Sequence, residues 1–94
     1  MATTGIAAID FGATPVIEAS VSVIGQAGIL SNSFIEAFMQ GSTTIDNNAE
    51  AHRLAGASFQ FYCDTIIDGV GFTIRAVSTI GEATGTFNVR WVWN

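Results

Sequence analysis

The feature that most constrains this chain is an alternation of apolar and polar residues with a period of two. From Ile17 to Val23, apolar side chains at every second position are separated by Glu18, Ser20 and Ser22. Side chains of a β-strand point alternately to opposite faces, so this pattern predicts a strand with one buried face. A helix would need apolar residues three and four positions apart, which this segment does not supply.

The same alternation covers residues 57–64, 71–78 and 84–94, and weaker patterns predict two further strands at 6–11 and 33–40. Turn signals such as Asp68–Gly69 separate these runs at intervals of about ten residues, which is typical of all-β proteins. We therefore expect residues 1–94 to form one all-β domain. The expected architecture is a small antiparallel β-sandwich or barrel of about six to eight strands, jelly-roll or immunoglobulin-like.

The alternation also predicts which residues form the core. We expect the buried faces to include Val21, Val23, Phe59, Phe61, Phe72, Ile74, Phe87, Val89 and Trp91. Because Trp91 and Trp93 lie on the apolar face of the last segment, we predict a central strand there rather than a frayed end. Trp91 should be fully buried, and Trp93 should lie at the rim, where a neighbouring subunit could cover it.

Two segments depart from this pattern. Residues 33–40 have large apolar groups on both faces, so we expect a strand that packs on the core and also against a partner or a loop. A short helix is the alternative there. Residues 42–56 show no alternation and predict a long connection with a short helix at 49–54. Asp46 or Asn47 is the expected cap of this helix, and Gly56 its expected end.

Charge is scarce in this sequence. Charged residues make up 12% of the chain, against about 25% in an ordinary soluble domain. There is no lysine, the cations are Arg53, Arg75 and Arg90, and the net charge is −5. Three dispersed arginines cannot form a basic patch, so we expect neither nucleic-acid binding nor attraction to an anionic membrane. A surface this poor in charge favours a subunit that is partly covered in a homo-oligomer, such as a trimer.

Few residues are of types that support chemistry, and we expect no cofactor and no catalytic site. Asp46, Glu50 and His52 are plausible ligands for a divalent metal, but their spacing does not bring all three to one helix face. The favoured interpretation is a helix cap and a solvated helix face. A third possibility is that His52 packs at a subunit interface.

Three other combinations have weaker support. Cys63 with His52 resembles a thiol–imidazole pair, but Cys63 shares the apolar face of its strand. Asp64 and Asp68 flank a turn, where aspartate is common for conformational reasons. An aromatic platform for sugars would combine Tyr62 with the tryptophans at 91 and 93, but their apolar face favours the core.

Several short motifs occur in a distinctive order: DFGATP, ASVSVIGQAGI, EAF, TIDNNAEAH, GVGFTI and GTFNVRWVWN. Together they resemble a group of short β-rich proteins that tailed bacteriophages encode near or among their virion genes. The resemblance covers most of the chain, and none of its motifs is catalytic. In that group a histidine often follows the aspartate of the connection, whereas this chain has Asn47 at that position.

The resemblance implies a virion component made in the host cytoplasm, and the N-terminal segment does not resemble a signal peptide. We expect a capsid decoration or cement subunit that binds the major capsid protein, or another virion protein, as an oligomer. The expected interface residues are Phe34, Phe38, Met39, Asp46, Asn47, Glu50, His52, Arg53 and Trp93. The alternative is a tail or head-fibre accessory that binds a host glycan or surface protein. A small metal-dependent enzyme is the least favoured hypothesis.

Overall fold

All six predicted strands form, and the sequence alternation determines which side of each strand is buried. The computed structural model describes residues 2–39, 44 and 47–94. Its elements are β1 (Thr3–Asp10), β2 (Glu18–Val23), β3 (Ile35–Met39), α1 (Ala49–Ser58), β4 (Phe59–Ile67), β5 (Gly71–Ser78) and β6 (Thr86–Trp93). The prediction of a mostly-β fold with one short helix is confirmed, and residues 33–40 contain a strand rather than a helix.

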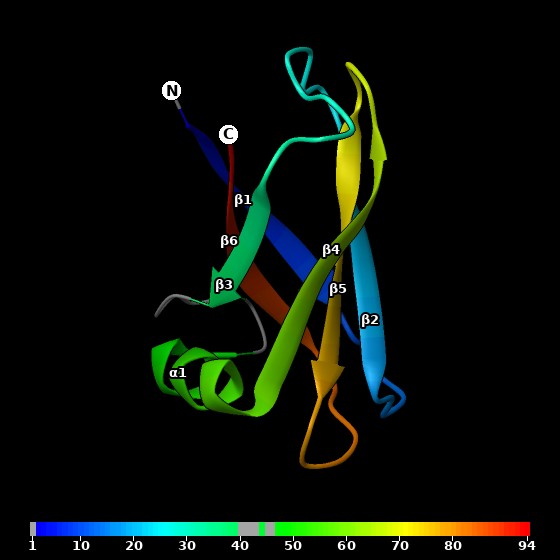
Figure 1. Ribbon diagram of the computed structural model, residues 1–94. Coiled ribbons are helices and arrows are strands. Elements are labelled where there is room, and N and C mark those ends of the chain that lie inside the picture. Colours follow the sequence, from blue (N-terminus) through cyan, green and yellow to red (C-terminus); the bar gives the residue numbers. More distant parts are fainter. Residues whose placement is uncertain (1, 40–43, 45–46) are drawn as a thin grey trace.

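The strands form two antiparallel sheets of three strands each. Sheet A has the order β1-β6-β3, and sheet B has the order β2-β5-β4. β6 is central in sheet A, as predicted, because it pairs with β1 along its whole length and with β3 from Val89 to Trp93. Figure 1 shows α1 at one end of the molecule beside β3, and the two chain termini close together at the other end.

One hairpin joins neighbouring strands in the described part of the chain, and the other connections pass from one sheet to the other. The hairpin joins β4 to β5 through the predicted Asp68–Gly69 turn. Gly69 has a φ of 73°, a conformation that glycine adopts without steric cost, and the Val70 N–H donates to the Ile67 carbonyl at 3.0 Å. The turn therefore forms for the reason that its sequence indicated.

The core lies where the inner faces of the two sheets meet. Phe72 of sheet B and Trp91 of sheet A pack edge to face, with ring centroids 5.5 Å apart. Six residues of the predicted core are buried: Val23, Phe72, Ile74, Phe87, Val89 and Trp91. Val21, Phe59 and Phe61 are partly buried and pack against them. The buried core also includes Ile9, Phe11, Ile29, Ala55 and Ala76, which the prediction omitted.

Small neighbours make room for Trp91 on the inner face of sheet A. In the strand register, Gly5 of β1 and Ala37 of β3 lie on either side of Trp91. A Cβ atom added at Gly5 would overlap the Trp91 indole ring. The glycine is therefore required by the close approach of a large ring and not by its own backbone conformation.

The helix differs from its prediction at both ends. Its cap is Asn48, whose Oδ1 accepts from the Ala51 N–H at 2.8 Å. The predicted cap Asn47 instead directs its side chain to the Thr86 carbonyl of β6, and the other predicted cap, Asp46, lies outside the described residues. The assignment failed because several polar residues precede the helix, and only the tertiary contacts separate their roles.

Gly56 does not end the helix. α1 continues to Ser58 and leads directly into β4, with the Phe59 N–H donating to the Ala55 carbonyl. A Cβ atom added at Gly56 would lie 3.0 Å from the Cβ of Met39. Gly56 therefore allows the helix to pack closely on β3, and this contact explains a glycine that the sequence pattern suggested was a terminator.

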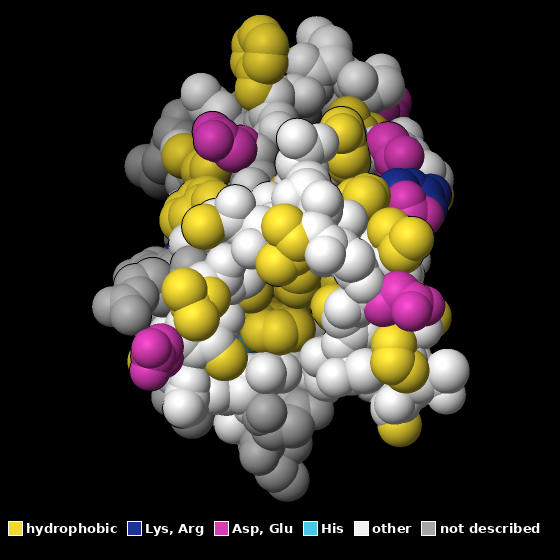
Figure 2. Space-filling model, turned by 90° about the horizontal axis from the view of Figure 1, so that it is seen from below, with side chains coloured by type: hydrophobic (Ala, Val, Ile, Leu, Met, Phe, Trp, Pro, Cys, Tyr) yellow, Lys and Arg dark blue, Asp and Glu magenta, His cyan; other side chains and the backbone are white. Residues whose placement is uncertain are grey.

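The end of the molecule that includes α1 is not completely covered. Figure 2 shows this end as a hollow in which apolar side chains are visible below a polar rim.

Among the residues that the structure describes, no helix is both long enough and apolar enough to cross a membrane.

Candidate functional site

His52, the strongest candidate for chemistry in the sequence, is fully buried and bound on both sides by backbone groups. Its Nδ1 lies 3.0 Å from the Asn48 carbonyl, and its Nε2 lies 2.9 Å from the backbone N–H of Asn88. A carbonyl only accepts and an N–H only donates, so these partners require the neutral Nδ1–H tautomer. The ring also packs edge to face against Phe87, with centroids 5.2 Å apart.

This geometry changes the interpretation of the predicted metal ligands. Both nitrogens of His52 are engaged, and Glu50 is exposed on α1. No three His, Cys, Asp or Glu side chains come together as a metal-binding group in the part of the chain that is described, which does not include Asp46. The prediction that His52 contributes to an exposed interface is wrong, because none of its surface is accessible.

Side chains of Thr44, Asn47 and His52 instead form hydrogen bonds to the backbone of β6 beyond its pairing with β3. Among the described residues, β3 pairs with β6 as far as Met39 and Val89. Further along β6, His52 accepts from the Asn88 N–H, and the Thr86 carbonyl accepts from Asn47 Nδ2 at 2.9 Å and from Thr44 Oγ1 at 2.7 Å. Polar backbone groups that would otherwise be left unpaired by the short strand are therefore bonded by side chains. Asn47, predicted at an interface, has this structural role.

Cys63 is half-buried on the inner side of β4. Burial, and then the negative charges of Asp64 and Glu36, raise the pKa of the Cys63 thiol from 9.0 to about 11. A nucleophilic cysteine needs the opposite shift, since the thiolate is the reactive form. His52 has no free nitrogen to accept the thiol proton, so the hypothesis of a thiol–imidazole pair has no geometric support.

On the outer face of sheet B, polar side chains of β4 and β5 bond to one another. Arg75 Nε donates to Asp64 Oδ2 at 2.9 Å and to Oδ1 at 3.1 Å, and the Tyr62 hydroxyl donates to Gln60 Oε1 at 2.8 Å. Asp64 therefore belongs to an ion pair with Arg75, and Asp68 belongs to the hairpin turn. The two aspartates do not form an acid–base pair.

The three predicted platform aromatics lie in different places. Tyr62 is exposed on sheet B, whereas Trp91 is buried in the core. Trp93 is half-buried at the rim, and its Nε1–H donates to Gln26 Oε1 at 2.9 Å. The loop that contains Gln26 therefore packs on part of Trp93 from within its own chain, and coverage of the rest of the ring by a neighbouring subunit stays a prediction.

The remaining predicted interface residues separate into two groups. Phe34 and Phe38 are 84% and 41% exposed, whereas Met39 packs against the core and α1. The alternation of β3 turns Met39 inward, so the exposed apolar side chains of this segment are Phe34 and Phe38. The side chain of Arg53 lies outside the described part of the structure.

A surface cleft of about 350 Å³ lies where β1 leaves sheet A. Its lining includes Asp10, Asn47 and Thr86. Asp10 Oδ1 already accepts from the Gly12 N–H at 2.8 Å, and Asn47 bonds Thr86. The lining contains one ionisable side chain, so the cleft offers no acid–base pair.

A second exposed apolar feature lies at the end opposite α1, and we call it the aliphatic loop end. It consists of the loops 24–30 and 67–70, with Ile24, Leu30, Ile67 and Val70 exposed. Two backbone bonds join the loops, from Gln26 N–H to the Val70 carbonyl and from Gly69 N–H to the Ile29 carbonyl, each 2.9 Å. The sequence analysis missed this surface, because neither loop has an apolar run of its own.

Comparison with known proteins adds no relative. No protein-family model, no curated protein sequence and no solved structure matches this chain.

Proposed function

We propose that this protein is a structural subunit of a bacteriophage virion, a capsid decoration or cement protein that binds the particle surface. We further propose that its two sheets form a β-sandwich of the kind predicted from the sequence. The sequence resemblance supports the phage assignment. The aliphatic loop end is the observation that supports a docking role.

The loop end has the properties of a docking surface. Its four aliphatic side chains come from two loops that are bonded to each other, so they are presented without a large cost in conformational entropy on binding. Ile24, Ile67 and Val70 also line one groove of about 150 Å³, which could receive an apolar side chain from a partner. Clustered exposed apolar residues on a small protein are typical of protein–protein contacts.

The mechanism would be passive. A subunit bound at the junction between capsid proteins adds contacts that must break before the shell can expand. Packaged DNA presses outward, so each added contact raises the force that the shell withstands. Oligomeric binding would strengthen the attachment through avidity.

The experiment is co-sedimentation of purified protein with capsids that lack it, followed by thermal challenge of the particles. We expect saturable binding and a higher temperature of DNA release. Ile24→Asp should abolish binding, since it places a charge at the loop end. Ile80→Asp is the matched control, because Ile80 is similarly exposed and belongs to the β5–β6 loop, which lies at the opposite end of the molecule (Figure 1).

Absence of binding to any virion part would contradict the proposal. Equal loss of binding in both variants would contradict the loop end as the docking surface. A folded state in each variant, checked by circular dichroism, makes these outcomes interpretable.

A further inference from the structure

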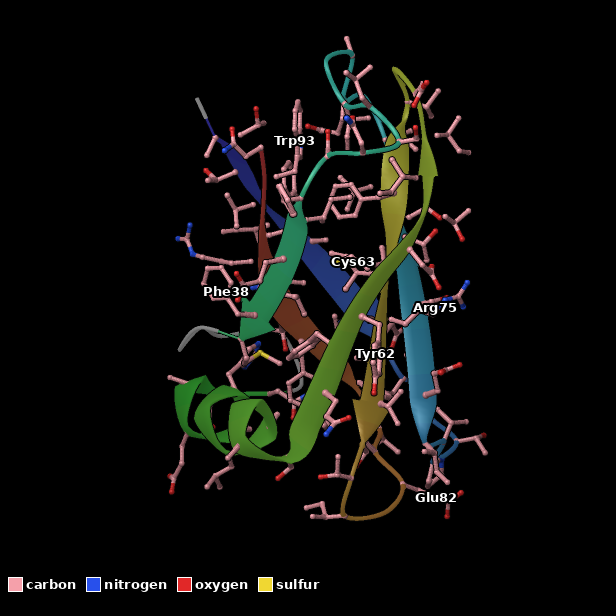
Figure 3. All side chains as sticks on the ribbon, viewed as in Figure 1. Phe38, Tyr62, Cys63, Arg75, Glu82 and Trp93 are labelled. Carbon is pink, nitrogen blue, oxygen red and sulfur yellow. The ribbon has the colours of Figure 1, made fainter. Side chains whose placement is uncertain are left out.

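The outer face of sheet A differs from an ordinary solvated sheet face. Its residues, by the alternation of the three strands, are Thr4, Ile6, Ala8, Asp10, Phe34, Glu36, Phe38, Thr86, Asn88, Arg90 and Val92. Ile6 is 56% exposed and Phe38 41%, and both lie in one row across the sheet, on either side of Arg90. Figure 3 shows Phe38 and Arg75 pointing away from the body on opposite sides, from sheet A and sheet B respectively.

Two of the three charged side chains on this face have no partner in the described part of the chain. Arg90 and Glu36 have no hydrogen bond or ion pair among the described residues, whereas on sheet B Arg75 is bonded to Asp64. The third, Asp10, accepts from the Gly12 N–H. Phe34, Glu36 and Val92 also line an open groove of about 320 Å³. The face therefore combines exposed apolar groups with a cation and an anion that no described residue pairs.

We infer that the outer face of sheet A is a self-association surface, on which a second copy of this chain packs face to face about a two-fold axis. The occupant follows from charge. Each chain has a net charge of −5, so two copies repel unless opposite charges meet in the contact. This face offers a cation, Arg90, and an anion, Glu36, which lie on neighbouring strands and are unpaired among the described residues. Its third charge, Asp10, lies apart from them at the end of β1. On sheet B, by contrast, Arg75 is already bonded to Asp64.

The strand register makes the face complementary to itself. Arg90 lies opposite Phe38, and Val92 lies opposite Glu36, so these four residues occupy the corners of one cell of the sheet. Neighbouring strands are about 4.8 Å apart and outward residues of one strand about 7 Å apart. Arg90 and Glu36 lie on one diagonal of this cell, and Phe38 and Val92 lie on the other. A two-fold axis in the interface that exchanges Arg90 of one copy with Glu36 of the other therefore runs close to Phe38 and Val92.

This geometry specifies the contacts. Phe38 and Val92 would each meet their own counterparts at the centre, and two symmetric Arg90–Glu36 pairs would flank them, as a two-fold interface requires. Three strands of this length present a footprint of roughly 400 Å² per chain, about half of a standard interface. We therefore expect a weak, concentration-dependent dimer.

Self-association rests on the proposed function and deepens it, since a decoration subunit gains avidity from it. Dimerisation and capsid binding can nevertheless be tested separately. Ile24→Asp should lose capsid binding and still dimerise. A monomeric Arg90→Glu variant should still bind capsids, with lower avidity.

The test is charge reversal followed by sedimentation equilibrium at several concentrations. The unmodified protein should show a monomer–dimer equilibrium. Arg90→Glu and Glu36→Arg should each raise the dimer Kd by about tenfold or more, because like charges then face each other. The double variant should restore the original Kd. Glu18→Arg, on sheet B, is the control with the same charge change as Glu36→Arg, and it should leave the Kd unchanged.

Oxidative cross-linking tests the predicted axis. In a Cys63→Ala background, Val92→Cys should form an intermolecular disulfide, whereas Tyr62→Cys on sheet B should not. A monomer at every concentration would overturn the inference. So would unaffected association in the single charge variants, or a failure of the double variant to restore it.

Discussion

The outer faces of the two sheets contrast sharply, although their inner faces follow the same rule. On sheet B, the polar groups bond to one another, as in the Arg75–Asp64 ion pair and the Tyr62–Gln60 hydrogen bond. On sheet A, Ile6 and Phe38 are exposed, and Arg90 and Glu36 have no partner within the described chain. Folding of one chain accounts for both inner faces and for the outer face of sheet B.

This contrast separates side chains that stabilise the folded monomer from exposed side chains on sheet A that do not. Sheet B is what a solvated sheet face looks like, since each exposed charge on β4 and β5 has a neighbour of opposite sign. Sheet A has the same number of strands and the same alternation, but its outward residues gain little from the monomer. The predictions below test each side of this comparison, from the largest expected effect to the smallest.

Removal of residues 90–94 should unfold the protein. The deletion removes Trp91 and Trp93 and most of the strand that joins β1 to β3, so sheet A loses its centre. Loss of a buried tryptophan side chain alone costs about 3–5 kcal/mol, which is much of the stability of a domain this small. Circular dichroism on heating is the measurement. A cooperative transition in the truncated protein would show that sheet B can fold without sheet A.

His52→Leu should destabilise the protein by about 1–3 kcal/mol, because it removes the ring nitrogen that accepts from the part-buried Asn88 N–H at the edge of sheet A. Urea unfolding measures this change. Tyr62→Phe on sheet B is the control, since it removes an exposed hydrogen bond, and it should change the free energy of unfolding by less than about 0.5 kcal/mol. A similar loss in both variants would contradict the structural role of His52.

Gly5→Ala should cost about 1–3 kcal/mol, since the new methyl group overlaps the Trp91 ring in the core of sheet A. Gly28→Ala is the matched control at the rim, where the added Cβ would lie 3.3 Å from Trp93. That contact needs only a small adjustment, so its cost should be lower. Equal free energies of unfolding would indicate that Trp91 is no more tightly packed than Trp93.

Cys63 reports on the edge where sheet B meets β3. Because the thiol pKa rises from 9.0 to about 11, the thiolate fraction at pH 8 should be about 100-fold lower than in the unfolded chain. Alkylation of the folded protein should therefore be slow at pH 8 and should accelerate as the pH approaches 11. Equal rates with and without urea would contradict the burial of this thiol.

The same shift has a consequence for stability, and its sign is fixed by linkage. Between pH 9 and 11 the unfolded chain loses the Cys63 proton first, so stability falls as the pH rises through this range. Cys63→Ala should remove this part of the pH dependence, which urea unfolding at pH 8 and pH 10.5 can measure.

Asp64→Asn should have the smallest effect. The Arg75–Asp64 ion pair is substantially exposed, so its loss should cost less than about 1 kcal/mol and less still at high salt. Glu36→Gln on sheet A is the matched control, and it should leave monomer stability unchanged because Glu36 has no ion pair in the described structure. A larger loss for Glu36→Gln would reverse the comparison between the two faces.

The sequence predicted the local part of this fold well. Alternation placed all six strands, the inward set of β6 and the Asp68–Gly69 turn, because each depends on residues close together in the chain. The central position of β6 followed from two tryptophans on one apolar face. Met39 was assigned to an interface because both faces of its segment have large apolar side chains, and local pattern does not say which of them turns inward.

The sequence by itself determined that this chain forms strands, which side of most strands is buried, and that its surface is poor in charge. Only the tertiary structure decided the roles of Asn47, His52 and Gly56, since these depend on where β3 stops along β6 and how closely α1 approaches Met39. It also decided that Arg90 and Glu36 share a face. The physical reason is that strand order, register and packing join residues from 17 positions apart (Gly56 and Met39) to 54 (Arg90 and Glu36), which no local period encodes.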